Sequence, residues 1–167
     1  MKQKISRKYL EIKSLKDFKE EKKPSDNYSV NLADSKDFQL NKFCYREIGK
    51  KHKWIDRLSW NDLNWTKYNS NPKLFTYLLQ DGNEIVGYFE LVYETKTKVA
   101  EIAYFGIFEE YFGKKLGGYL LSEAIKCAFS KGAKRLWVHT CSNDHKNALN
   151  NYLSRGMKIF KTETLII

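Results

Sequence analysis

The sequence has 167 residues, of which 42% are hydrophobic and 15% aromatic, a composition that suits one domain with an apolar core. The formal net charge is +10. Most cations are lysines spread along the whole chain, whereas a nucleic-acid reader would concentrate arginines and aromatic residues on one element. We therefore expect no nucleic-acid partner, although the positive field would favour a small polyanionic ligand.

The sequence offers no sign of export, membrane insertion or metal binding. No stretch approaches the roughly 20 apolar residues of a membrane span, and the basic N-terminus is not followed by an apolar signal core. We expect a cytoplasmic protein with no membrane partner. The odd set of Cys44, Cys127 and Cys141 has no close pairing, and the histidines are not spaced as ligands, so neither a disulfide framework nor a metal site is expected.

Residues 1–72 are expected to carry two short strands and two helices. In chain order, the expected elements are a strand over Lys4–Ile12, an exposed connection over 13–27, a strand over Tyr28–Leu32, a helix opened by the capping residues of Asp34–Asp37, and a helix from Ser59 or Asn61 to about Asn69.

From residue 73 on, strand patterns dominate, with a strong hairpin signal at Asp81–Asn83. The expected elements are strands over Lys73–Gln80, Glu84–Glu94 and Lys98–Ile107, a helix over Leu116–Phe129, a strand over Arg135–Thr140, a helix over Asn143–Arg155 and a strand over Met157–Ile167. A hairpin meander that leads into βαβ units predicts an α/β (α+β) fold, a mixed sheet with helices on both faces.

A glycine-containing turn connects the strand that ends at Ile107 to the following amphipathic helix. Gly113, Gly117 and Gly118 allow the backbone to approach a ligand closely. The N–H groups at a helix start can converge on phosphate oxygens, and Lys114 and Lys115 add positive charge. The spacing matches neither a P-loop nor a dinucleotide fingerprint.

In this context the turn resembles the cofactor-binding motif of the GNAT superfamily of N-acetyltransferases, Arg/Gln-x-x-Gly-x-Gly/Ala. Phe112 takes the Arg/Gln place, Lys115 the first glycine place and Gly117 the second. Two of these three positions depart from the pattern. Lys115 in a glycine place implies either a negative φ or a remodelled loop.

The stretch from Trp137 to Met157 supplies the family's second half, a strand followed by Asn-x-x-Ala-x-x-x-Tyr-x-x-x-Gly-Phe. Ala148, Tyr152 and Gly156 fall on that spacing, and His145 stands where asparagine is common. A subgroup with Tyr-Phe-Gly-Leu before the turn and His-Thr-Cys-x-x-Asp-His after it is still closer. The resemblance covers residues 84–160 well and residues 1–72 faintly.

The resemblance implies a mostly antiparallel sheet of six to seven strands in which one parallel pair splays apart to hold acetyl-CoA, the cosubstrate. It also implies one acetyltransferase domain over 1–167, with 1–72 on the acceptor side and 73–167 forming the sheet and cofactor core. The cofactor-binding residues would be Phe105, Gly106, Ile107, Phe112, Gly113, Lys114, Lys115, Leu116, Gly117, Gly118, Asn143, His145 and Ala148.

Acetyl transfer needs a base for the amine, donors for the oxyanion and an acid for the leaving thiolate. The family transfers the group by direct attack and places a tyrosine hydroxyl near the CoA sulfur, which implies Tyr152 as general acid. His145, Ala148 and Tyr152 would share one helix face. Glu101, in an otherwise apolar strand, and His139 are both candidates for the base, with a water chain as a third.

The acceptor amine would be bound by the segment 35–70. Trp54 and Trp60 could pack around an ammonium group, and Arg57 or Arg46 could hold a substrate carboxylate. Tryptophans on amphipathic helices are, however, more often core residues.

The sequence thus predicts an N-acetyltransferase that acts on a small-molecule or peptide amine. A non-catalytic CoA-sensing domain of the same fold is the alternative, and a basic nucleic-acid-binding protein is a third reading. The apolar end of Met157–Ile167 could pair across a homodimer interface.

Overall fold

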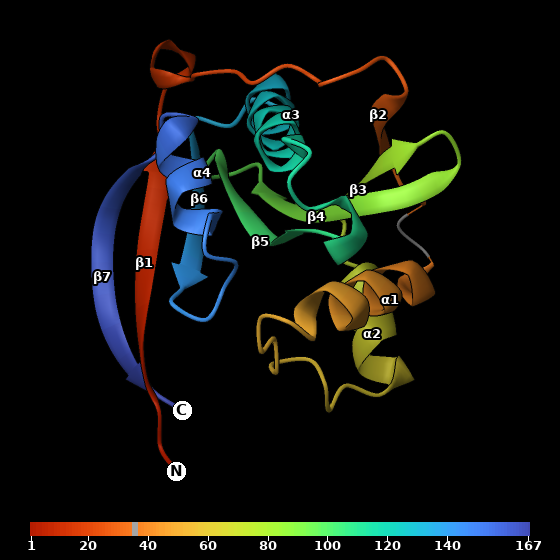
Figure 1. The fold of residues 1–167 in the computed structure, drawn as a ribbon, viewed down its shortest axis with the longest axis vertical. Coiled ribbons are helices and arrows are strands. Elements are labelled where there is room, and N and C mark those ends of the chain that lie inside the picture. The colour runs from red at the N-terminus through yellow and green to blue at the C-terminus, as the bar shows by residue number, and fades with distance from the viewer. Residues whose placement is uncertain (35–36) are drawn as a thin grey trace.

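The computed structural model describes residues 1–34 and 37–167; Ser35 and Lys36, within the predicted helix start, lie outside the described residues. Figure 1 shows a central sheet with helices on both faces. The elements are β1 (Lys4–Ile12), β2 (Tyr28–Leu32), α1 (Phe38–Gly49), α2 (Asp62–Asn69), β3 (Leu74–Asp81), β4 (Glu84–Glu94), β5 (Val99–Ile107), α3 (Leu116–Ser130), β6 (Arg135–Cys141), α4 (Ala148–Ser154) and β7 (Lys158–Ile166), with short 3₁₀ turns at Leu15–Asp17 and Glu109–Tyr111.

The sheet has seven strands in the order β2-β3-β4-β5-β6-β1-β7. Every neighbouring pair is antiparallel except β5 and β6, which are parallel. This is the predicted mixed, mostly antiparallel sheet. The two-residue turn between β3 and β4 confirms the hairpin, and Gly82 takes the positive φ of 58° that such a turn favours.

The position of β1 could not be read from the sequence. Although β1 precedes β2 in the chain, it lies five places away from it in the sheet, between β6 and β7. The connection 13–27 therefore crosses the whole domain along the outer side of α3 (Figure 1). Residues 1–72 are accordingly divided, with β1 beside β6, β2 at the opposite edge of the sheet and α1 packed on the central strands β4 and β5.

Local sequence chemistry sets the helix starts. Asp37 caps α1 by accepting a hydrogen bond from the Gln39 N–H. Asn61 and Asn64 form a reciprocal capping box at α2, so Asn61 is the cap of the two predicted starting points. α3 buries apolar residues against the sheet as its periodicity predicts.

The predicted helix Asn143–Arg155 was wrong at its start, because α4 begins only at Ala148. The Asp144 carboxylate turns back on the end of β6. It accepts hydrogen bonds from Thr140 Oγ1 at 2.5 Å and from the Cys141 N–H at 3.0 Å. An aspartate that bonds local backbone in this way favours a turn over a helix.

Two apolar cores lie on opposite faces of the sheet. The larger one joins α3 to residues of β1, β4, β5 and β6, and it includes Leu10, Phe89 and Leu120. The smaller one lies under α1 and contains Cys44, Ile48 and Tyr88. Burial of these side chains fixes both helix layers on the sheet.

The parallel pair β5 and β6 separates soon after it begins. The strands pair only at Val99–Arg135, Ala100–Leu136 and Glu101–Trp137. Beyond these residues β5 continues to Ile107 and β6 to Cys141 without pairing to each other. The predicted splayed pair is therefore present, and it opens a gap in the middle of the sheet.

Candidate active site

A cavity of about 620 Å³ lies between the separated parts of β5 and β6. Its walls are the separated parts of the two strands, the glycine-containing turn before α3, the loop between β6 and α4, and the loop between α1 and α2. The volume lies in the range of small-molecule sites. The sheet thus provides a site that reaches from a helix N-terminus on one face toward the α1–α2 loop on the other.

The turn before α3 keeps a glycine-like backbone even where glycine is missing. Gly113 has φ 79°, and a Cβ there would meet open space, so the conformation rather than crowding requires glycine. Lys115, the residue before α3, has φ 61°. Of the two expected alternatives, a negative φ or a remodelled loop, the negative φ is excluded, because the lysine adopts a left-handed conformation that disfavours side chains with a Cβ. Lys115 lines the cavity.

Lys114 is placed differently. Its ammonium group lies 5.3 Å from the centre of the Tyr111 ring, and the residue is not part of the cavity wall. Of the two predicted lysines, only Lys115 is positioned to meet a ligand in the cavity.

α4 and the connection 13–27 pack against the start of α3. Asn151 donates to the Gly117 carbonyl at 3.0 Å, which ties α4 to the start of α3. Glu21 pairs with Arg155 where a side chain at Gly118 would otherwise stand. Glu21 also donates its N–H to Ser122 Oγ at 2.9 Å. A carboxylate and a guanidinium therefore lie beside the helix N-terminus.

Tyr152 lies in the cavity wall on the α4 side. Its side chain is only 5% exposed and its ring packs edge-on against Phe105 of β5, with centroids 6.2 Å apart. Burial, and next the charge of Asp144, raise the pKa of the Tyr152 hydroxyl above its ordinary value. The hydroxyl therefore stays protonated at neutral pH and can donate a proton.

Glu101 does not share a face with Phe105, although the alternation of side chains along an unbroken strand would place both on one face. Leu91 pairs with Ile102 but Glu90 pairs with Tyr104, so Ala103 is an extra residue in β5. Such a bulge inverts the alternation of side chains. Glu101 consequently lies on the face of Tyr104 and is not part of the cavity wall. Burial raises its pKa and the Arg57 charge lowers it, with a net increase.

His139 of β6 does line the cavity. Burial is the main cause that lowers its pKa, and the positive charge of Arg7 lowers it further; Asp144, Asp56 and Glu163 act in the opposite direction. A histidine with a lowered pKa is neutral at physiological pH, the form that accepts a proton. Between the two predicted side-chain bases, the cavity contains only His139.

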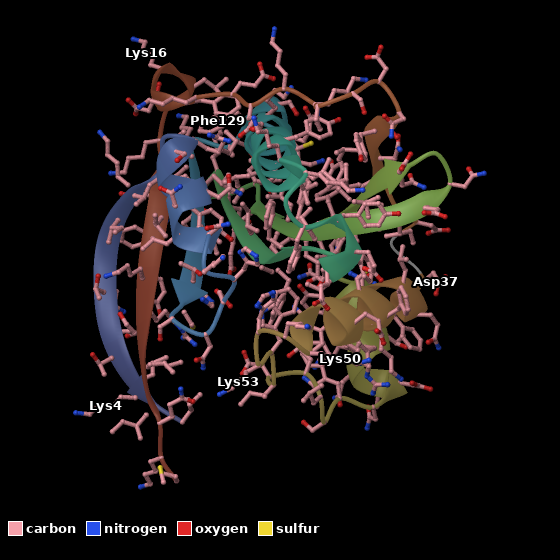
Figure 2. The ribbon with its side chains drawn as sticks, viewed as in Figure 1. Lys4, Lys16, Asp37, Lys50, Lys53 and Phe129 are labelled. Atoms are coloured by element: carbon pink, nitrogen blue, oxygen red, sulfur yellow. The ribbon has the colours of Figure 1, made fainter. Side chains whose placement is uncertain are left out.

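The α1–α2 loop forms the opposite wall. Trp54 packs on Tyr104 with ring centroids 4.9 Å apart, and the Tyr104 hydroxyl donates to Asp56 at 3.3 Å. Figure 2 shows Lys53 of the same loop, whose ammonium reaches Gln3, before β1, at 3.4 Å. Aromatic rings and a carboxylate together suit a cationic group.

The loop between β6 and α4 completes the wall. Asn143 and His145 lie in this loop, so His145 does not share a helix face with Tyr152 as predicted. The His145 ring contacts Phe112 at 4.7 Å and His52 at 5.9 Å between centroids. It therefore bridges the turn before α3 and the α1–α2 loop.

Arg57, a predicted ligand for a substrate carboxylate, is occupied by the protein itself. Its guanidinium bonds both carboxylate oxygens of Glu90, at 3.0 and 3.1 Å, and its side chain is 6% exposed. Trp60 and Tyr68 pack on it with centroid distances of 4.8 and 4.1 Å. Neither Arg57 nor Trp60 is part of the cavity wall. This cluster holds the α1–α2 loop against β4.

Most predicted site residues meet in this one cavity. The predicted residues that line it are Trp54, Phe105, Gly106, Ile107, Phe112, Gly113, Lys115, Leu116, Gly117, Gly118, His139, Asn143, His145, Ala148 and Tyr152. The sequence-based reasoning missed further polar residues of the wall, among them Arg7, Glu21, His52, Asp56, Asn151 and Arg155. Arg7 and Glu21 reach the cavity only because β1 lies beside β6. No local sequence pattern predicts this position of β1.

The residues at the α3 turn fit the pyrophosphate of CoA, with backbone N–H groups, the positive end of a helix and the cation Lys115, while Arg155 beside them is paired with Glu21. Among residues 1–34 and 37–167 there is no cluster of metal-ligating side chains. In the same ranges no helix is long and apolar enough to cross a membrane.

Solved structures share this fold at low sequence identity. A GCN5-related N-acetyltransferase from Sphaerobacter thermophilus has 13% identity and a TM-score of 0.70, covering 97% of this chain and 50% of that one. An IAA acetyltransferase from Bacillus cereus ATCC 14579 has 22% identity and a TM-score of 0.61, covering 80% and 79%. An aminoglycoside acetyltransferase from an uncultured soil metagenomic sample, in complex with trehalose, has 14% and 0.64, covering 80% and 90%.

The first two structural matches are longer proteins, of which the chain spans 62% and 50%. No curated protein sequence matches the chain. The fold and the cavity define an acetyltransferase architecture. Residues 38–157 match the sequence model of the Acetyltransferase (GNAT) family, more than half of the chain, and the protein belongs to that family.

Proposed function

We propose that the protein transfers the acetyl group of acetyl-CoA to a primary amine by direct attack in a ternary complex. The observation that carries this proposal is the cavity between the separated strands β5 and β6, which joins the turn before α3 to His139 and the α1–α2 loop. A thioester bound from one face and an amine bound from the other would meet within it.

Residues of this cavity can carry every proton transfer that the acetyl transfer needs. His139 takes a proton from the ammonium form of the acceptor, and the neutral amine nitrogen attacks the thioester carbon. The C–N bond forms, the C–S bond breaks and Tyr152 protonates the departing thiolate, while the proton that the nitrogen loses on becoming an amide restores the Tyr152 hydroxyl. Backbone N–H groups of β5 near Phe105–Ile107, which have no strand partner on the β6 side, stabilise the tetrahedral oxyanion.

The first experiment measures acetyl-CoA binding by calorimetry and thiol release with a panel of amines. Tyr152→Phe removes only the hydroxyl, and we expect kcat to fall about 100-fold with acetyl-CoA affinity unchanged. Tyr119→Phe is the matched control, because Tyr119 is also largely buried but lies outside the cavity wall. Full kcat in Tyr152→Phe would refute the general-acid role.

A second pair of variants identifies the base. His139→Gln should lower kcat about 100-fold, while Glu101→Gln, which changes a side chain outside the cavity, should leave it nearly unchanged. The reverse result would reassign the base to Glu101. Acetyl-CoA binding without turnover of any amine would instead identify the chain as a non-catalytic CoA sensor.

A further inference from the structure

The acceptor end of the cavity contains an arginine with unused hydrogen-bonding capacity. Arg7 of β1 lies opposite Cys141 of β6 and lines the cavity. Its Nε atom is buried without a hydrogen-bond partner, whereas the rest of the guanidinium interacts with the side chains of Cys141 and Tyr9. The nearest carboxylate within the described parts of the chain, Glu163, is 3.9 Å from its Nη1, beyond hydrogen-bond distance. The Tyr9 hydroxyl donates to that same carboxylate at 2.5 Å.

A guanidinium in this situation suits an external anion. Its side chain is 26% exposed, so part of its hydration is already lost, and a carboxylate could bond it with two parallel N–H···O contacts. The other cation at this end, Lys53, is exposed and already contacts Gln3. Arg57 is occupied by Glu90. Arg7 is therefore the cation at this end best placed to bind an acceptor carboxylate.

The opposite wall suits the amine of the same molecule. Asp56 supplies a carboxylate, and Trp54 and Tyr104 supply aromatic faces. His139 lies within electrostatic range of both Arg7 and Asp56, whose charges act on it in opposite directions. The proposed base therefore lines the same cavity as a group that suits a negative charge and a group that suits a positive one.

Building on the proposed function, we infer that the acceptor is a small amino acid, with a free carboxylate a few bonds from its amine, and that Arg7 binds this carboxylate. The Asp56 side holds the ammonium group until His139 deprotonates it. A neutral amide in place of the carboxylate would leave the Arg7 guanidinium without a matching anion, which is costly in a half-buried site.

The test compares the twenty L-amino acids, β-alanine and γ-aminobutyrate with the corresponding carboxamides, using thiol release from acetyl-CoA. We expect at least one amino acid to have a kcat/KM about 10- to 100-fold above that of its amide. Arg7→Gln should abolish this preference by raising KM for the amino acid, with little change for the amide. Arg7→Lys should restore part of it.

Arg46→Gln is the matched control, because Arg46 is exposed on α1 outside the cavity wall, and it should leave the preference unchanged. Equal use of acid and amide by the unaltered protein, turnover confined to amines without a carboxylate, or an equal loss for both substrates in Arg7→Gln would overturn the inference alone. Absence of turnover with every amine would overturn the proposed function as well.

Discussion

Arg7 and Arg57 differ in how fully a carboxylate of the protein itself binds their guanidinium groups. Arg57 is buried, bonded to both oxygens of Glu90 and enclosed by aromatic rings. Arg7 is a quarter exposed, lines the cavity and has no carboxylate within hydrogen-bond distance in the described chain. A buried arginine bonded to a carboxylate stabilises the fold, whereas one at a cavity wall with only a long, partly solvated ion pair remains available to a ligand.

The Glu90 cluster also explains why the α1–α2 loop can form one wall of the site. Besides Arg57, the Glu90 carboxylate accepts hydrogen bonds from Tyr68 at 2.6 Å and from Asn41 at 2.9 Å. Burial of Glu90 is complete. Because every partner comes from α1, α2 or the loop between them, this one carboxylate of β4 anchors the acceptor-side segment to the sheet.

The largest expected difference between the two arginines is in stability. Glu90→Gln leaves the Arg57 charge buried and unpaired, and we expect the free energy of unfolding to fall by about 3–5 kcal/mol. Arg7→Gln should cost less than about 1 kcal/mol, because its ion pair is long and partly solvated. Urea denaturation measures both. Glu47→Gln, in an exposed pair with Lys50, is the control, and equal losses for Glu90→Gln and Arg7→Gln would contradict the distinction.

A second difference should appear in the pH profile. The Arg7 charge helps to hold the pKa of His139 below its ordinary value of 6.5, so the base stays neutral, and activity is kept, until the pH falls below that lowered pKa. Arg7→Gln removes this charge, raises the pKa of His139 and should move the acid limb of kcat/KM to higher pH. The measurement uses an amino acid amide, which does not depend on Arg7 for binding. An unchanged limb would argue against His139 as the base.

The smallest expected effect is a change in stability at Lys115, a cation of the cavity wall with a strained backbone conformation. Since its φ is 61°, Lys115→Gly should relieve strain and raise the free energy of unfolding by about 0.5–1 kcal/mol. Lys115→Ala removes the same charge but keeps the strained conformation, so it should bring no such gain. Thermal denaturation of both variants, with acetyl-CoA affinity measured alongside, separates the effect of the Lys115 charge from the effect of its backbone strain.

The cavity wall at the turn before α3 could be predicted because its signals are local. Gly113 stands in the turn between β5 and α3, Gly117 and Gly118 stand in the first turn of α3, and Tyr152 follows at a fixed spacing in α4. Lys115 shows that the backbone shape persists even where the usual glycine is replaced. The acceptor half could not be predicted in the same way, and Arg57 was assigned to it from residue type alone.

By itself, the sequence determined most of the elements, their β-β-β-α-β-α-β succession along the chain from residue 73 on, and the residues of the turn before α3, because hydrophobic period and turn chemistry act over a few neighbouring residues. Tertiary structure alone decided that β1 lies between β6 and β7, which brings Arg7 into the cavity and places Glu21 beside α3. It also decided the bulge at Ala103, which turned Glu101 away from the face of Phe105, and the pairing of Arg57 with Glu90. Each of these three features depends on contacts between residues far apart in the chain. Packing and charge in the folded protein determine which residues meet.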